Sequence, residues 1–356
     1  MPAAAVRDEL GRTRGRRVRG ELFVAGLAWL VACLGPRIAG LRPPELTEQS
    51  SGVDADLRAV MAVSGEAAWA SGSGGTWLRT QDGGATWQSG VVVGAETLDF
   101  RSLAAFDAER ALLLSAGPSS RMFRTDDRGK NWRAVYRNDT PGIFFDALAF
   151  ADGSRGYALG DPIEGRFVLI ETTDGGESWH ELPGPEAKPG EGAFAASNSA
   201  LGIRGEDLWF ATGGSAARAF HSTDRGRTWS AIDAPAPTGA PSRGLFSLAV
   251  IGGGLVALVG GDYLAPEAPG AFAMSRDWGR TWEKGPAPPG YRSSLSSTGR
   301  GRVVATGTSG TDSLEFGGRW DGVGPGYNAV AMRGEVGWAV GPKGRVARLR
   351  SRQYGP

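Results

Sequence analysis

An eight-residue pattern, Ser/Thr-x-Asp-x-Gly-x-x-Trp, occurs five times and constrains the fold more than any other feature of the chain. The copies occupy residues 80–87, 125–132, 172–179, 222–229 and 275–282. Their aspartates, Asp82, Asp127, Asp174, Asp224 and Asp277, are separated by 45, 47, 50 and 53 residues. A period of this size is typical of propellers and solenoid arrays.

The pattern has the chemistry of a tight hairpin corner. The short aspartate side chain accepts hydrogen bonds from backbone N–H groups a few residues on, and the glycine two positions later supplies a positive φ. The tryptophan is large enough to fill the space between neighbouring units. We therefore expect a structural role for the five aspartates and for the tryptophans at positions Trp87, Trp132, Trp179, Trp229 and Trp282.

A second landmark precedes each corner, a β-type run that ends in small residues. It occurs at 68–72, 112–115, 157–160, 208–213 and 255–260, and twice more without a good corner at 303–307 and 337–341. The chain therefore has seven units. Its 57 glycines, 21 prolines and 22% charged residues favour short strands and turns over long helices.

The first unit contains four expected strands, at 57–63, 67–71, 77–80 and 86–90. Four short antiparallel strands per repeat make the blade of a β-propeller. The sequence thus predicts an all-β, seven-bladed propeller. Unit six is the least regular, with a third strand expected at 313–320 and a degenerate corner at Asp321-Gly322, so a six-bladed ring is the fallback.

The seventh unit lacks a fourth strand after residue 349. Residues 45–51 precede the first innermost strand, so we expect them to pair into the last blade and close the ring, which removes open sheet edges. The propeller then covers residues 45–352, with 34–44 as a linker that contains Gly35-Pro36 and Pro43-Pro44.

The N-terminus has the features of an export signal. Residues 1–21 carry six arginines and three acids, and the apolar run Leu22 to Leu34 is too short to span a bilayer comfortably. The run ends Leu30-Val31-Ala32-Cys33, which resembles a bacterial lipobox, so residues 1–33 are expected to be a signal with lipidation at Cys33. An ordinary cleaved signal, an uncleaved anchor and a buried helix are the alternatives.

Charge and histidine content bear on several classes of ligand. The whole chain carries +1 and residues 1–33 contribute +3, so the remainder carries −2, without the basic surplus of a nucleic-acid-binding protein. The two histidines, His180 and His221, flank hairpin corners, so no histidine-based metal site is expected, and no residue pattern locates a carboxylate-only Ca²⁺ site at the channel, which is the alternative. The glycine-rich segments lack a following helix, so no nucleotide or other cofactor is expected either.

Loops opposite the Asp corners form the expected binding face. In a four-stranded blade, the connections from strand two to three and from one blade to the next share one face, and the long loops of this chain fall there. These loops carry most of the unusual polar residues: Asp146, Asp161, Arg166, Glu191, Asn198, Arg218, Arg243, Asp262, Tyr263, Arg292, Asp312, Tyr327 and Asn328. The alternative for any single residue is a structural one, in which its side chain is exposed to solvent on a loop or forms a weak surface ion pair.

The corner pattern is the Asp-box, or BNR, repeat, and other phrases resemble a bacterial branch of the photosystem II stability/assembly factor family. These phrases lie at 156–162, 191–198, 211–214, 244–248, 260–263, 326–330 and 337–341, within roughly residues 50–350. The resemblance implies a seven-bladed, exported propeller. In photosynthetic organisms such proteins bind a newly inserted reaction-centre subunit and use an arginine patch, for which Arg166, Arg218, Arg243 and Arg292 are available, interleaved with acids.

Two functions follow as hypotheses. The first is a non-catalytic propeller, tethered by Cys33 to the periplasmic face of a bacterial membrane, that binds a membrane-protein partner. The second is a sialidase-like glycoside hydrolase or a glycan-binding propeller, with a small molecule or glycan as ligand. It would use Arg166, Arg218 and Arg243 on a sugar carboxylate and Tyr263, Glu191 and Asp161 in the chemistry. The chain lacks the Phe/Tyr-Arg-Ile-Pro motif of sialidases.

Overall fold

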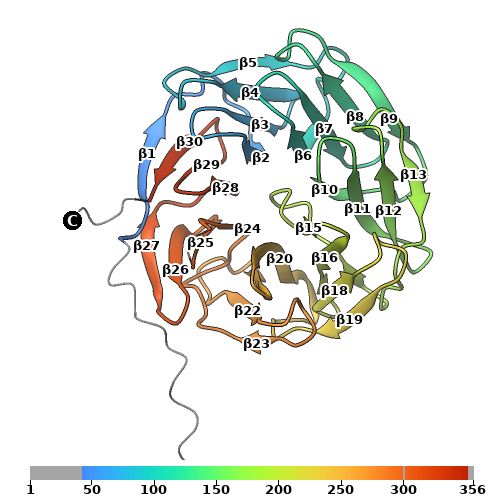
Figure 1. Cartoon of the computed structure of the whole chain (residues 1–356), viewed down its shortest axis with the longest axis vertical. Coiled ribbons are helices and arrows are strands. Elements are labelled where there is room, and N and C mark those ends of the chain that lie inside the picture. Colours follow the sequence, from blue (N-terminus) through green and yellow to red (C-terminus); the bar gives the residue numbers. More distant parts are fainter. Residues whose placement is uncertain (1–41, 300, 352–356) are drawn as a thin grey trace, which may run out of the picture. The chain divides into compact units, whose positions relative to one another are not determined.

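The computed structural model describes residues 42–299 and 301–351, which form seven antiparallel sheets arranged around a central axis (Figure 1). The expected seven-bladed, all-β propeller is confirmed. No helix in this part of the chain is long and apolar enough to cross a membrane. The expected signal and Cys33 lie outside the described residues.

Each blade is a meander of four strands, with the first strand innermost (Figure 1). Blades one and two contain β2 (Leu57–Ala62), β3 (Ala68–Gly72), β4 (Thr76–Thr80), β5 (Gln88–Val91), β6 (Asp99–Ala105), β7 (Ala111–Ala116), β8 (Ser120–Thr125) and β9 (Arg133–Asn138). Blades three and four contain β10 (Phe145–Phe150), β11 (Gly156–Ile163), β12 (Arg166–Thr172), β13 (His180–Leu182), β15 (Leu201–Arg204), β16 (Asp207–Ala211), β18 (Arg218–Ser222) and β19 (Ser230–Asp233).

The remaining blades follow in the same order around the ring. Blades five to seven contain β20 (Ala240–Gly252), β21 (Leu255–Asp262), β22 (Ala271–Ser275), β23 (Glu283–Lys284), β24 (Ser294–Ser297), β25 (Arg302–Gly307), β26 (Gly310–Glu315), β27 (Trp320–Gly324), β28 (Ala329–Arg333), β29 (Val336–Val340) and β30 (Val346–Arg350). Two short strands, β14 (Glu191–Gly192) and β17 (Gly213–Gly214), extend the sheet of blade five on its inner side.

Glycine permits this inner extension of blade five. A Cβ on Gly213 would lie 2.4 Å from the Arg243 carbonyl oxygen, and Gly214 has a φ of 88°. Only a residue without a side chain lets the backbones of β14, β17 and β20 approach so closely.

The ring is closed by β1 (Glu45–Gln49), as the sequence predicts. This strand pairs antiparallel with β30, in a register from Glu45 opposite Arg350 to Gln49 opposite Val346. The Gln49 side chain also crosses to blade one, where its Nε2 donates to the Gly83 carbonyl at 2.8 Å and its Oε1 accepts from Trp87 at 3.2 Å. The first and last segments of the propeller are thus joined both by a ladder and by side chains.

The core is divided into seven apolar clusters, each filled from two neighbouring blades. Between blades one and two, Trp69 and Trp77 pack with Phe100 and Phe123. The Asp-box residue Trp132 joins them, with its ring centroid 6.2 Å from that of Trp69 and 5.9 Å from that of Trp77. The other Asp-box tryptophans, Trp87, Trp179, Trp229 and Trp282, also pack against clusters that two neighbouring blades share.

The Asp boxes form closed corners with one repeated geometry. In the fourth copy, Ser222 donates to the Asp224 carboxylate at 2.8 Å, which accepts from the Thr228 N–H, also at 2.8 Å. Two successive residues adopt positive φ in every copy, including Arg225 at 64° and Gly226 at 80°. The hydrogen bonds from Thr228 and Ser222 lower the pKa of Asp224 to about 2.

Blade six departs from the expected strand boundaries. Its third strand ends at Glu315 and its fourth begins at Trp320, so the corner lies at residues 316–319. Asp321 and Gly322 are inside β27, and the expected corner at these residues was wrong. Trp320 nevertheless packs edge-on to Phe272 of blade five, at 5.3 Å, in the manner of an Asp-box tryptophan.

The closing strand is expected to carry a large share of the stability of the ring. A chain that begins at Ser51 loses the β1–β30 ladder, several hydrogen bonds worth roughly 1 kcal/mol each, and leaves β30 as an open edge. Its free energy of unfolding should be lower by at least about 3 kcal/mol than that of a chain beginning at Arg42. Urea denaturation measures the difference, and a peptide of residues 42–50 should restore stability. Equal midpoints for the two chains would show that closure does not depend on β1.

Candidate functional site

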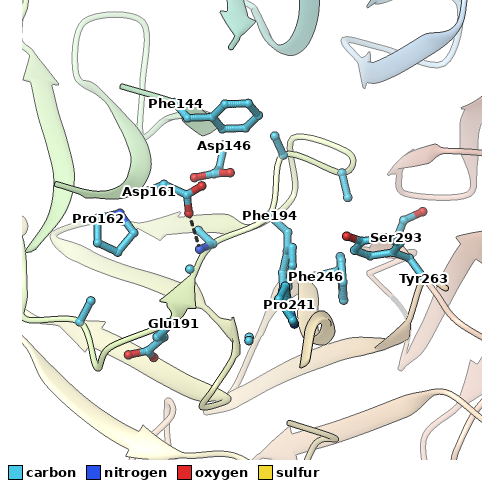
Figure 2. Close-up of a pocket in the computed structure, with 18 of the residues that line it drawn as sticks. Phe144, Asp146, Asp161, Pro162, Glu191, Phe194, Pro241, Phe246, Tyr263 and Ser293 are labelled. Carbon is cyan, nitrogen blue, oxygen red and sulfur yellow. Dashed lines mark hydrogen bonds between the residues drawn. The ribbon is translucent and has the colours of Figure 1, made fainter. Parts of the chain in front are cut away.

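A cavity of about 1200 Å³ opens on the face opposite the Asp boxes. Figure 2 shows part of its lining. Its lining comes from the connections between second and third strands and between blades, where the long loops were expected. The residues used in the argument below are Arg58, Arg101, Phe144, Asp146, Asp161, Lys188, Glu191, Ala193, Phe194, Ala195, Ala196, Phe246, Tyr263, Tyr291, Ser293 and Asn328.

Four β-bulges supply lining residues at equivalent positions. The pairing of the innermost strand with its neighbour shifts by one residue at Arg58 in blade one, Arg101 in blade two, Asp146 in blade three and Phe246 in blade five. A bulged residue leaves the regular alternation of the strand and points its side chain in a new direction. Here all four line the cavity.

The segment from Ala193 to Ala200 lines the cavity and hydrogen-bonds to inner strands of blades two, three and five and to Ser293 beside the inner strand of blade six. Ala193, Phe194, Ala195 and Ala196 line the cavity. The next residues bind the inner strands of other blades. Asn198, at a φ of 65°, donates to the Leu103 carbonyl at 2.7 Å and accepts from the Leu148 N–H at 2.9 Å. Ser197 donates to the Ser293 carbonyl at 2.7 Å. The ring therefore holds this segment at several points, which makes it a firm part of the lining.

Aromatic rings form one wall. Phe194 and Phe246 are stacked (Figure 2), with centroids 3.7 Å apart. Tyr291 and Tyr263 meet Phe246 edge-on, at 4.8 and 6.1 Å. Tyr291 is buried, which raises the pKa of its hydroxyl. Tyr263 is 46% exposed and stands at the rim. This wall suits an apolar or planar group of a ligand.

Two carboxyl groups occupy another part of the lining. Asp146 is 1% exposed, and neither of its carboxyl oxygens forms a hydrogen bond of ordinary geometry with a described residue, although the Ala195 N–H is close enough to lower its pKa. Asp161, on the neighbouring strand β11, accepts one hydrogen bond, from the Ala193 N–H at 3.0 Å (Figure 2). Burial raises the pKa of Asp146 well above its ordinary value, and the nearby Asp161 carboxylate raises it further. Arg101 and the Ala195 N–H act in the opposite direction but do not outweigh burial.

Asp161 is itself perturbed in the same sense. Burial raises its pKa, and the hydrogen bond from Ala193 only partly offsets this. A carboxylate in such surroundings lacks the hydration that it has in water. The two carboxyl groups therefore have too few hydrogen-bond donors around them and no ion-pair partner.

Glu191 lines the same cavity, but its carboxylate is well supplied with hydrogen-bond donors. Its carboxylate accepts from Arg218 Nε at 2.9 Å, the Thr212 hydroxyl at 2.6 Å and the Lys188 N–H at 2.8 Å. Burial alone would raise the pKa of Glu191, but these hydrogen bonds outweigh burial and lower it. Glu191 is thus a fully satisfied anion that fixes the loop around β14.

The structure brings only part of the expected binding set together. Asp146, Asp161, Glu191, Tyr263 and Asn328 line the cavity. The others do not line it: Arg166, Asn198, Arg218, Arg243, Asp262, Arg292, Asp312 and Tyr327. Arg292 and Asp312 form a buried ion pair in which Nε lies 2.8 Å from the carboxylate. The buried Tyr327 donates to Glu48 of the closing strand at 3.3 Å.

The three arginines considered for a sugar carboxylate do not converge on the cavity. Arg166 pairs with Glu186 at 2.7 Å, Arg218 with Glu191, and Arg243 with Asp262 at 2.9 Å. Each guanidinium is therefore already opposite an acid. His221, expected outside the binding face, stacks on Trp209 at 4.6 Å.

The sequence analysis missed Arg58, Arg101, Phe194, Phe246 and Tyr291. The bulged positions do have a sequence signal. Each follows a large apolar residue of the innermost strand and precedes a small residue, as in Phe100-Arg101-Ser102, Phe145-Asp146-Ala147 and Leu245-Phe246-Ser247. Aligning the first strands of the units would have placed these residues at one position of the ring.

The unpartnered carboxyl of Asp146 predicts an unusual response of stability to pH. Because its pKa is higher in the folded than in the unfolded chain, stability should fall as pH rises from the ordinary value near 3.8 toward the raised one. Asp146→Asn should raise the free energy of unfolding at pH 7 by about 1 to 3 kcal/mol and flatten this fall.

Asp152→Asn is the matched control for this measurement. Hydrogen bonds from the Arg155 N–H and Ser154 lower the pKa of Asp152 to about 2, so its loss should destabilise the fold at pH 7. Urea denaturation between pH 4 and 8 tests both. A destabilised Asp146→Asn variant with an unchanged pH slope would mean that the native carboxylate is well paired.

Comparison with known proteins supports the repeat, the resemblance and the fold. The model of the BNR/Asp-box repeat matches residues 220–231. Over 111 residues the chain is 30% identical to the chloroplast photosystem II stability/assembly factor HCF136 of Arabidopsis thaliana, a match that covers 31% of this chain and 26% of that protein. The sequence match thus supports the expected resemblance to photosystem II stability/assembly factors. That the chain belongs to a bacterial branch stays a prediction.

Several solved structures have a similar fold. YCF48 bound to a D1 peptide has a TM-score of 0.62 at 16% identity, covering 88% of this chain and 98% of that one. YCF48 from Cyanidioschyzon merolae has a TM-score of 0.59 at 14% identity, covering 86% and 98%. Virginiamycin B lyase from Staphylococcus aureus has a TM-score of 0.66 at 13% identity, covering 87% and 100%. At these identities the structural similarity describes the fold.

Proposed function

We propose that this chain is a non-catalytic binding propeller that holds a segment of a partner protein in its cavity and acts in the assembly of a membrane protein. The observation that carries the proposal is the cavity itself, lined by the segment 193–200 and walled by aromatic rings. The solved complex of YCF48 with a D1 peptide supports the same class of ligand for a propeller of this fold.

The size and lining of the cavity suit a stretch of polypeptide. Its volume of about 1200 Å³ exceeds the range of roughly 300 to 1,000 Å³ that is usual for small-molecule pockets. Polar groups reach it from several blades, and they lie beside an apolar wall. An extended segment with alternating polar and apolar side chains can satisfy both.

Exposed apolar side chains on the same face support a protein partner. Among the described residues, the large hydrophobic side chains that are clearly exposed are Val91, Val93, Tyr263 and Leu264, at 49%, 91%, 46% and 76%. Tyr263 and Leu264 lie in the β21–β22 connection, where Tyr263 lines the cavity, whereas Val91 and Val93 belong to blade one and do not line it. Apolar residues at a pocket rim commonly become contact residues when a protein docks.

Capture of a partner from membranes tests this proposal. The double variant Tyr263→Ala, Leu264→Ser removes apolar contact area at the rim without touching the core, and should lose at least tenfold in recovery of the partner. Val93→Ser is the control, an exposed apolar residue outside the cavity lining. The measurement is affinity purification from detergent-solubilised host membranes with quantitative mass spectrometry. Equal recovery by the wild type and the double variant would contradict docking at this rim, and glycan arrays would then test the other ligand class.

We further propose that the propeller is exported and tethered to the periplasmic face of a bacterial membrane through a lipid on Cys33. The basic segment, the short apolar run and the sequence Leu30-Val31-Ala32-Cys33 support this proposal. A lipid tether anchors a domain beside the membrane without spanning it. Such a position gives the cavity access to loops and termini of membrane proteins.

Cys33→Ser should abolish lipid attachment because the thioether forms on this sulfur. Cells grown with an alkyne fatty acid should label the wild-type protein and leave the variant unlabelled, and the variant should lose its membrane association as a lipoprotein. Asp152→Asn, outside the N-terminal segment, serves as a labelling control. An unlabelled wild-type protein would favour an ordinary cleaved signal or an uncleaved anchor.

A further inference from the structure

The charged groups that line the cavity differ in whether they have partners. Arg58 lies 3.2 Å from Asp56, Arg101 lies 2.7 Å from Asp99, and Lys188 lies 3.2 Å from Asp233. Glu191 is paired with Arg218. Among the charged lining residues that the structure describes, Asp146 and Asp161 alone lack an ion-pair partner.

These two acids come from adjacent strands of blade three and lie close together. Asp146 is the bulged residue of β10, and Asp161 lies beyond Gly160 on β11 (Figure 2). The bulge turns Asp146 out of the strand alternation and toward the cavity wall. The Asp146 side chain is almost completely buried and forms no hydrogen bond of ordinary geometry with a described residue, and the nearby Ala195 N–H and Arg101 offset its burial only in part. Its carboxyl is therefore a costly group to keep in an apolar site.

The surroundings of the pair suit a long basic side chain. Phe144 lies beside Asp146, and the stacked rings of Phe194 and Phe246 lie across the cavity (Figure 2). Lysine and arginine have apolar stems that pack on such surfaces and cationic ends that bind carboxylates and aromatic faces. An ammonium or guanidinium group supplies both the missing charge and the missing donors.

We propose that the Asp146–Asp161 pair is a recognition site for a lysine or arginine side chain of the bound protein segment, with an apolar neighbour of that residue on the Phe194–Phe246 wall. This inference deepens the proposed function and rests on it. It selects a basic residue because the cations Arg58, Arg101 and Lys188 are already opposite acids.

Binding of the basic group should release a proton. In the empty cavity, burial and the proximity of Asp161 on β11 favour a protonated carboxyl at Asp146, while Arg101 on β6 acts against this. A bound cation stabilises the ionised form of the pair. Affinity should therefore rise with pH, and the measured heat of binding should depend on the ionisation enthalpy of the buffer.

Blocked peptides with one varied central position test the proposal on the full chain. The centre is lysine, arginine, norleucine or glutamate, flanked by phenylalanine, and agmatine is a small-molecule probe. By isothermal titration calorimetry, the lysine and arginine peptides should bind at least tenfold more tightly than the norleucine peptide. Asp161→Asn and Asp146→Asn should remove this preference, so that each variant binds the lysine and norleucine peptides with equal affinity. Glu267→Gln removes an exposed acid on the same face and should have no effect.

The possible results distinguish a failure of the cation site from a failure of the proposed function. Three results would overturn the cation site. The lysine and norleucine peptides bind equally, the glutamate peptide binds more tightly than the lysine peptide, or neither the peptides nor agmatine bind. Membrane-partner capture that persists in Asp161→Asn would then leave the proposed function standing. Agmatine binding that is lost in Asp161→Asn, together with failed partner capture, would support the cation site and overturn a protein ligand.

Discussion

Closure of the ring is the constraint on which the other features depend. Seven sheets share seven apolar clusters, each filled from two blades, so no blade can bury its faces alone. The pairing of β1 with β30 completes the seventh sheet, and Gln49 joins it to blade one. A closed ring has no end at which the stack can fray, which gives a rigid frame for a central cavity.

The binding surface lies where the blades depart from regularity. Bulges in four innermost strands turn Arg58, Arg101, Asp146 and Phe246 toward the cavity. The insertion between blades three and four lines the cavity and is held there by Asn198 and its neighbours. Regular blades supply the frame, and local irregularities supply the chemistry, a division of roles that is common in closed β-structures.

The cavity lining has little unpaired charge, so its electrostatic preference for a ligand comes from a few groups. Most of its ionic groups are paired, and such pairs mainly fix loops in place. The Asp146–Asp161 pair is an exception because neither carboxyl has an ion-pair partner and the pair has too few hydrogen-bond donors beside it. An unsatisfied group that is costly to the empty protein can give specificity to the complex, since a ligand that satisfies it regains that free energy.

The sequence alone determined the fold to a large extent. Five Asp boxes in phase predicted the blades, and a missing last strand predicted that residues 45–51 close the ring, because turn chemistry and strand periodicity are local properties. The corner of blade six was misplaced at Asp321-Gly322, since its turn lacks the Asp-box pattern. The residues of the candidate site were harder to predict from the sequence than the fold. Polar loop residues such as Arg243 and Asp262 looked free in sequence and proved to be paired, whereas Arg58 and Phe246 looked like strand residues and proved to line the cavity. Only the tertiary structure decided these assignments, because ion pairing, burial and bulge direction depend on contacts between segments that are far apart in the chain.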